Sequence, residues 1–96
     1  MATPVVYHFP YYWFGFMPPG AQHNWSFGPS ADFWKQGFVA TANPRLSDEL
    51  ERALTVSMIK SRRPGPPHFI DVFVRNVGPH PVYTYNLWLT IIDPNV

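Results

Sequence analysis

The sequence predicts a single all-β domain over residues 1–96, built as an antiparallel sandwich of six or seven strands. Three observations lead to this prediction. Apolar and polar residues alternate with period two in several stretches, which is the pattern of strands. Twelve prolines and six glycines interrupt the chain at short intervals, so long helices do not fit. The stretches recur at roughly even spacing, as is typical of sandwiches and barrels.

The first half of the chain is expected to contribute three strands. Residues 5–16 form an extended stretch, and Pro10 inside it is typical of an edge strand or a bulge, because proline lacks the N–H that a central strand donates. Residues 22–27 form the second stretch, between turn residues rich in proline and glycine. Residues 37–42 form a shorter third strand, which ends before Pro44.

The middle of the chain holds the one helical candidate, residues 47–52. Its first residue is a serine, which caps helices well, and the acidic residues after it suit a helix N-terminus. Either one helical turn or a charged loop is therefore expected. Residues 53–60 then alternate, with Leu54, Val56 and Met58 on one face, which predicts another strand.

Two strands with clean alternation are expected near the C-terminus, at residues 69–76 and 82–92. The first places Ile70, Val72 and Val74 on one face. The second places five apolar or aromatic side chains on one face, namely Tyr83, Tyr85, Leu87, Leu89 and Ile91. Because the short stretch between the two strands holds one glycine and two prolines, they are expected to pair as a β-hairpin.

Residues 70–78 form an apolar alternating strand that ends in an Asn-x-Gly turn, and residues 82–85 begin the strand after it. This stretch resembles immunoglobulin-like bacterial domains of the cell-adhesion type, and Pro19-Gly20 before the second strand resembles their loop-to-strand entry. The resemblance covers about a third of the chain, and no cysteine pair brackets a tryptophan as in antibody domains. It implies an immunoglobulin-like sandwich with an adhesive or binding role.

Composition narrows the classes of partner. The formal net charge is +1, so no broad basic surface is expected to attract nucleic acid or an anionic membrane. The one basic cluster, Lys60, Arg62 and Arg63, is typical of a solvated strand edge. No apolar run approaches the ~20 residues of a membrane span. The N-terminal residues lack a signal-peptide pattern, so the compartment stays open, with the cytoplasm as the default.

Candidate catalytic or metal-binding groups are few, and the absence of cysteine excludes disulfides and thiolate chemistry. The chain has four histidines, which are His8, His23, His68 and His80. None of them has the paired spacing of a metal site. Ser26, Ser57 and Asp71 supply parts of a hydrolytic triad, but no nucleophile-elbow motif frames either serine. The sequence therefore predicts a protein that is not an enzyme and that uses no metal or cofactor.

Aromatic residues are concentrated near the N-terminus, where eleven of the chain's seventeen lie between positions 7 and 34. In an extended strand, odd-numbered and even-numbered aromatics face opposite ways, so one inner sheet face cannot hold them all. Three interpretations stay open. The rings fill the core and the ends of the sandwich, or they form a protein interface, or they form a platform on which sugar rings stack.

The leading functional hypothesis is a non-catalytic interaction or structural module that self-associates through the aromatic-rich N-terminal segment. Aromatic residues are enriched and charged residues are depleted at interface cores. The expected interface residues are Tyr11, Tyr12, Trp13, Phe14 and Phe16. The alternative is a carbohydrate-binding, lectin-like module. Its expected ligand-binding residues are His23, Asn24, Trp25, Asp32 and Trp34.

Overall fold

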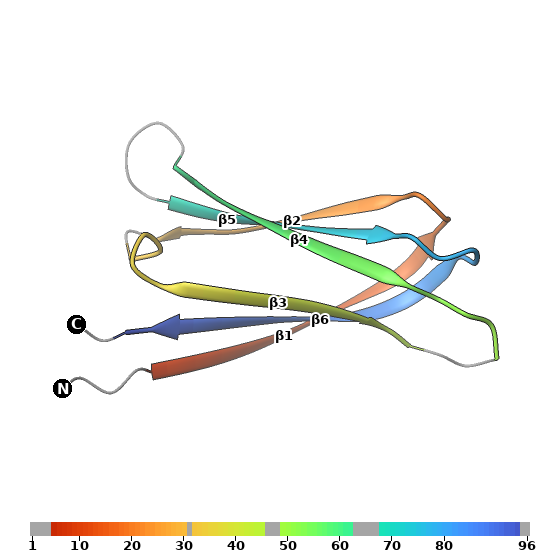
Figure 1. The fold of residues 1–96 in the computed structure, drawn as a ribbon, viewed down its shortest axis with the longest axis horizontal. Helices are drawn as coiled ribbons and strands as arrows, with labels where there is room; N and C mark the ends of the chain where they lie inside the picture. Colours follow the sequence, from red (N-terminus) through yellow and green to blue (C-terminus); the bar gives the residue numbers. More distant parts are fainter. Residues whose placement is uncertain (1–4, 31, 46–48, 63–67, 95–96) are drawn as a thin grey trace.

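The computed structural model describes residues 5–30, 32–45, 49–62 and 68–94 and places them in six antiparallel β-strands (Figure 1). The strands are β1 (Val5–Met17), β2 (Gln22–Ser30), β3 (Gly37–Pro44), β4 (Leu54–Arg62), β5 (His68–Asn76) and β6 (Val82–Asp93). The all-β fold class is confirmed, with six strands, and the described residues contain no helix.

The strands form two three-stranded sheets, which lie one above the other in Figure 1. The β6 sheet has the order β1-β6-β3, and the β5 sheet has the order β2-β5-β4. Among the described strands, β4 and β5 are the one pair of neighbours in the chain that also share a ladder of hydrogen bonds. Every other connection carries the chain from one sheet to the other.

The expected hairpin between residues 69–76 and 82–92 is wrong. β5 pairs with β2 and β4, whereas β6 pairs with β1 and β3. Both strands have one apolar face, and the two faces cover each other when the strands lie in different sheets. A central position also gives each strand a hydrogen-bonding neighbour on both sides, which satisfies its buried backbone groups.

The core lies between the two sheets, and its centre comes from the two central strands. The residues that face inward from β5 and β6 and are at most 2% exposed are Ile70, Val72, Val74, Tyr85, Leu87 and Leu89. This confirms the alternation predicted for these positions. Leu54, Val56 and Met58 of β4 pack against the same core, as expected.

Tyr83 was predicted to share one face with Tyr85, Leu87, Leu89 and Ile91, and for Tyr83 this is wrong. Val82 is fully buried and Tyr83 is half exposed, so the alternation of β6 changes phase before Tyr85. Between Phe14 and Met17 the β1–β6 register shifts, because β1 has one residue more than β6 there. A bulge of this kind re-aims side chains at the end of a ladder. Tyr83 therefore lies on the outer side of the β6 sheet.

The expected helical turn or charged loop over residues 47–52 begins outside the described residues. Residues 49–53 are irregular chain without a helix. Arg52 donates from Nε to the backbone carbonyl of Pro81 at 2.9 Å. The connection between β3 and β4 is therefore attached to the connection between β5 and β6.

Candidate functional site

The five aromatic residues expected at an interface divide between the two faces of β1. Tyr11 and Trp13 face the other sheet and pack against the core, so filling the interior accounts for them. Tyr12, Phe14 and Phe16 alternate with them and are 54%, 76% and 61% exposed. The exposed candidates therefore lie on the outer side of the β6 sheet.

Two further aromatic side chains lie on the same outer side. The ring centroids of Tyr83 and Phe16 are 5.7 Å apart. Trp88 lies opposite Pro10 in the β1–β6 ladder, two positions along β6 from the partner of Tyr12. Both added side chains are about half exposed. We call the set Tyr12, Phe14, Phe16, Tyr83 and Trp88 the aromatic face.

Sequence reasoning missed the last two members of the aromatic face. The alternation over residues 82–92 already places Trp88 opposite the inward residues, which the structure confirms. The missing signal is the pairing of β1 with β6, which brings positions more than sixty residues apart onto one face. A single sequence contains no local signal for that pairing.

The outer side of the β6 sheet carries few charges. In the β1–β6 and β3–β6 registers, the described outward positions include no aspartate, glutamate or lysine. His8 Nδ1 and Thr90 Oγ1 share a hydrogen bond at 3.0 Å. The guanidinium of Arg45 lies over the Tyr12 ring, 5.7 Å from its centroid. Such a cation–π contact covers part of the Arg45 guanidinium.

The outer side of the β5 sheet has a different character. Ser26 donates its hydroxyl to Asp71 Oδ1 at 2.8 Å, and Gln22 donates from Nε2 to Asn24 Oδ1 at 3.1 Å. Arg75 is also exposed there. Ile59 is exposed on this side too, but most of the exposed side chains here are polar or charged, as on a sheet face in contact with water. By contrast, the outer side of the β6 sheet exposes a largely apolar surface to solvent.

Three of the residues expected to bind sugar lie together at an edge of the fold. His23, Asn24 and Trp25 are consecutive on β2, which is the edge strand of its sheet. They border a pocket of about 440 Å³. We call it the edge pocket, and its lining residues are Trp13, Gln22, His23, Asn24 and Trp25.

The other two residues expected to bind sugar lie elsewhere. Asp32 and Trp34 belong to the turn after β2, and neither lines the edge pocket. Phe33 anchors this turn, because it is buried and its ring meets Phe38 edge to face at 5.1 Å. Asp32 forms an ion pair with Lys35 at 3.9 Å. The structure therefore does not bring the five residues into one site.

The interior wall of the edge pocket is held by Tyr85, a fully buried residue of β6. Its hydroxyl accepts a hydrogen bond from Trp25 Nε1 at 2.9 Å and lies 2.8 Å from His23 Nδ1. The Trp13 ring stacks on Tyr85 at 5.2 Å and meets the His23 ring at 4.4 Å. These contacts fix the three rings of the pocket to the core.

Burial shifts the ionisation of this network. Desolvation lowers the pKa of His23, so the neutral imidazole is favoured. Desolvation also raises the pKa of the Tyr85 phenol, although the hydrogen bond from Trp25 acts in the opposite direction. Both shifts favour the neutral imidazole and the neutral phenol. In these forms one hydrogen bond can join the Tyr85 hydroxyl to His23 Nδ1.

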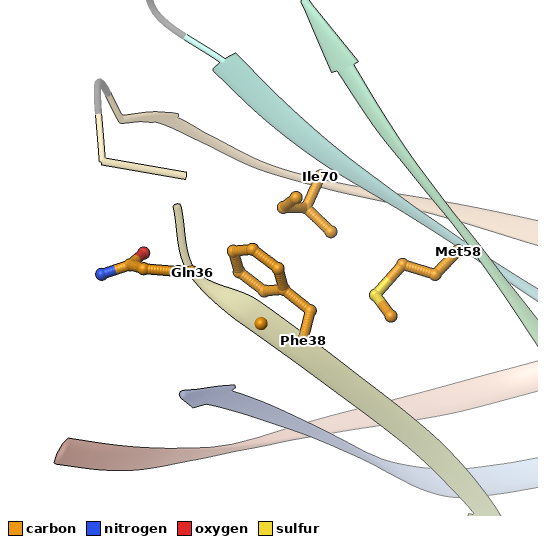
Figure 2. Close-up of a pocket in the computed structure, with 5 residues that line it drawn as sticks. Gln36, Phe38, Met58 and Ile70 are labelled. Atoms are coloured by element: carbon orange, nitrogen blue, oxygen red, sulfur yellow. The ribbon is translucent and has the colours of Figure 1, made fainter. Parts of the chain in front are cut away.

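A second pocket, of about 290 Å³, opens between the sheets beside β3 and β4 (Figure 2). Phe38, Met58 and Ile70 point toward one another from three strands, while the Gln36 side chain points away. Gln36 donates from Nε2 to Asp93 Oδ2 at 2.9 Å. With three apolar walls and one amide already bonded to a carboxylate, this pocket presents no convergent polar groups.

The metal ligands, the membrane span and the basic cluster considered in the sequence analysis add no further candidate site among the described residues. Within the part of the chain that the structure describes, no three histidine, cysteine, aspartate or glutamate residues gather as a metal ligand set. None of the described segments forms a helix of the length and apolarity that crossing a membrane requires. Lys60 and Arg62 lie on β4, and Arg63 of the same basic cluster lies outside the described residues.

Comparison of this chain with protein-family models, with curated proteins and with solved structures finds no match. The functional roles of the aromatic face and the edge pocket are therefore inferred from the geometry of these two sites alone.

Proposed function

We propose that this chain is a non-catalytic interaction module that self-associates through the aromatic face of the β6 sheet. One observation carries the proposal. Five aromatic side chains, each between 42% and 76% exposed, lie on a sheet side whose described residues include no carboxylate or lysine. Exposed apolar patches of this kind mark partner sites in soluble proteins.

The size of the aromatic face suits a dimer. A fully exposed aromatic side chain offers about 150–250 Å². The exposed fractions of the five rings then amount to about 500 Å² of surface. In a two-fold dimer each protomer contributes the same patch, so about 1,000 Å² is buried, which is the least expected of a biological interface and suits a weak dimer.

A second copy of this chain is the partner that this face fits. Among the outward residues that the structure describes, two copies placed face to face oppose no carboxylates and no lysines, so little charge loses its water. Thr41, Asn43 and Asn86 also lie on this side, and hydroxyl and amide groups can both donate and accept hydrogen bonds. Such groups are complementary to themselves across a two-fold axis, which a homodimer requires.

Sedimentation velocity over a series of protein concentrations tests the proposal. We expect a dimer with a Kd in the micromolar range, about −8 kcal/mol. Tyr12→Ser and Phe14→Ser are expected to weaken it by about tenfold or more each, because exposed rings at an interface centre carry most of the binding energy. Both side chains lie outside the core, so the variants are expected to fold.

Ile59→Ser is the matched control. Ile59 is 54% exposed, as Tyr12 is, and it lies on the outer side of the β5 sheet. We expect this variant to dimerise as the natural chain does. A natural chain that remains monomeric up to about 100 μM overturns the proposal, because the binding free energy is then weaker than about −5.5 kcal/mol. An equal effect of Ile59→Ser and Phe14→Ser overturns it too.

The finer class of the fold belongs to the same proposal. Two antiparallel sheets with alternate residues facing inward support a sandwich, as the immunoglobulin-like resemblance implies. In immunoglobulin domains the first two strands are neighbours in one sheet, whereas β1 and β2 lie in different sheets here. The support therefore comes from the layered architecture, and an experimental structure compared strand by strand tests the type.

A further inference from the structure

The edge pocket differs from the aromatic face in position and in chemistry. It lies at the free edge of β2, where side chains from both faces of the strand and Trp13 of β1 surround one space. Its volume of about 440 Å³ falls in the range of small-molecule sites. The free edge of a strand also presents unpaired backbone N–H and C=O groups to a ligand.

The aromatic walls of the pocket are ordered before any ligand arrives. Trp25 is fixed by its hydrogen bond to Tyr85 and by contacts with the Tyr11 and Phe27 rings, at centroid distances of 5.8 and 6.4 Å. Trp13 is fixed by its stacking on Tyr85. Binding to side chains that are already held loses little conformational entropy, so even a small ligand can bind measurably.

The imidazole of His23 presents a defined donor. An indole N–H can only donate, so the Tyr85 hydroxyl accepts from Trp25 and gives its own proton to His23 Nδ1. We assign the ring proton of the neutral histidine to Nε2 on this basis, because the other tautomer would leave the buried hydroxyl proton without an acceptor. His23 therefore offers one N–H to a ligand.

The two amides on the outer side of β2 add a donor and an acceptor. The hydrogen bond from Gln22 Nε2 to Asn24 Oδ1 occupies one atom of each amide. Gln22 Oε1 then remains as an acceptor and Asn24 Nδ2 as a donor. None of the five lining residues carries a formal charge when His23 is neutral. A phosphate or carboxylate would meet no cation among them, so the pocket suits a neutral ligand.

We propose that the edge pocket binds a neutral pyranose sugar, free or within a glycan. A pyranose has an apolar C–H face, which packs on an aromatic ring, and a rim of hydroxyls, which both donate and accept. Trp13 and Trp25 supply the rings, and Gln22, His23 and Asn24 supply the hydrogen-bonding groups. The proposal does not rest on self-association, because the aromatic face lies on the opposite side of β1.

The four tryptophans of the chain give a site-specific test. Indole N–H resonances of the ¹⁵N-labelled protein are followed while glucose, galactose, mannose, xylose, N-acetylglucosamine and their short oligosaccharides are added. We expect one sugar class to shift the Trp13 and Trp25 signals with a Kd of about 1 mM or tighter, typical of a small polar ligand. Trp34 and Trp88 lie outside the pocket and serve as internal controls.

Variants then separate the pocket from other surfaces. The double variant Gln22→Ala with Asn24→Ala is expected to weaken sugar binding by about tenfold or more, since it removes the hydrogen bonds that both amides give to the sugar hydroxyls. Both side chains are exposed, so the fold is expected to survive. Thr55→Ala removes an exposed polar side chain from β4, outside the pocket, and is expected to leave sugar binding unchanged.

Two results overturn the proposal. One is the absence of any shift at Trp13 or Trp25 with every sugar at about 20 mM, which excludes a Kd near 1 mM. The other is binding that the Gln22→Ala with Asn24→Ala variant retains in full. Repeating the titration on Phe14→Ser keeps the two proposals apart. A sugar shift in that variant supports the pocket whether or not the natural chain dimerises.

Discussion

The side-chain amide of Asn76 donates to the backbone carbonyl of Met17 at 3.0 Å, across fifty-nine positions of the chain. The same amide nitrogen donates to the carbonyl of His80 at 2.9 Å, and Oδ1 accepts from Gly78 N at 3.0 Å. The backbone of Asn76 adds bonds to Gly20 and Ala21, at 2.8 and 2.9 Å. One buried side chain therefore joins the β1–β2 turn to the β5–β6 connection.

Replacing Asn76 with alanine is expected to lower the free energy of unfolding by about 3 kcal/mol, because buried backbone groups that lose a partner cost about 1–3 kcal/mol each and water reaches some of them. Urea unfolding followed by tryptophan fluorescence measures it. Asn43→Ala, at an exposed position of β3, is the control and should change stability by less than about 0.5 kcal/mol. Equal effects of the two variants would contradict this assignment.

Gly78 is expected to tolerate no side chain. A Cβ there would lie 2.8 Å from the backbone nitrogen of Ala53, a group that cannot rotate away. We expect Gly78→Ala to lower the free energy of unfolding by about 1–3 kcal/mol, as overpacking does. At Gly37 the added carbon would lie 3.8 Å from Ile92, an ordinary contact, so Gly37→Ala should leave the free energy of unfolding unchanged. Thermal unfolding of the two variants distinguishes them, and a stable Gly78→Ala would disprove the steric argument.

The Tyr85 hydroxyl is expected to stabilise the fold as well as the edge pocket. Tyr85→Phe leaves Trp25 Nε1 and His23 Nδ1 without their shared partner, which costs about 1–2 kcal/mol. Tyr12→Phe, which removes a hydroxyl from an exposed ring, is the control and should be neutral. Denaturant midpoints at equal slope report the difference. If both variants unfold at the same midpoint, the hydroxyl has no structural role.

His23 is expected to make stability depend on pH. Its pKa in the folded chain is lowered by desolvation, so protonation favours the unfolded chain. Above the ordinary histidine pKa of 6.5 the neutral His23 costs no stability. As pH falls below 6.5 and through the lower pKa of the folded chain, the free energy of unfolding decreases. We measure the free energy of unfolding from about pH 7.5 to pH 5. The natural chain should lose more stability than His23→Gln over this window, and parallel profiles would refute the assignment.

Much of the fold follows from local patterns, and the errors have one cause. Alternation identified β5 and β6 and the inward sides of both, because burial between two sheets imposes period two. The pairing of these strands was wrong because a short, proline-rich connection fits a hairpin and also a crossing between sheets. The choice between a hairpin and a crossing depends on how much apolar area each arrangement buries. That area is a property of all six strands together.

The candidate sites show the same division. Alternation along β1 separates Tyr12 from Trp13, so the outward rings could be read from the sequence. Tyr83 could not, because a bulge opposite it changes the phase of the strand. Trp13 lines the edge pocket beside His23 because β1 and β2 lie at the same edge of two different sheets. No spacing in the chain indicates that neighbourhood.

Self-association through the aromatic face is expected to be insensitive to salt. Salt screens interactions between exposed charges, with a Debye length of about 10 Å at 0.1 M and 3 Å at 1 M. Among the described outward residues of the β6 sheet, Arg45 is the permanent charge, and it already lies over Tyr12. The Kd from sedimentation should therefore change by less than about threefold between 0.1 and 1 M sodium chloride. Sodium sulfate should strengthen dimerisation, since salts excluded from the protein surface favour apolar burial.

A dimer that weakens tenfold or more in sodium chloride would contradict an interface on the aromatic face and indicate a charged interface instead. The outer side of the β5 sheet, with Asp71 and Arg75, would then be the surface to mutate.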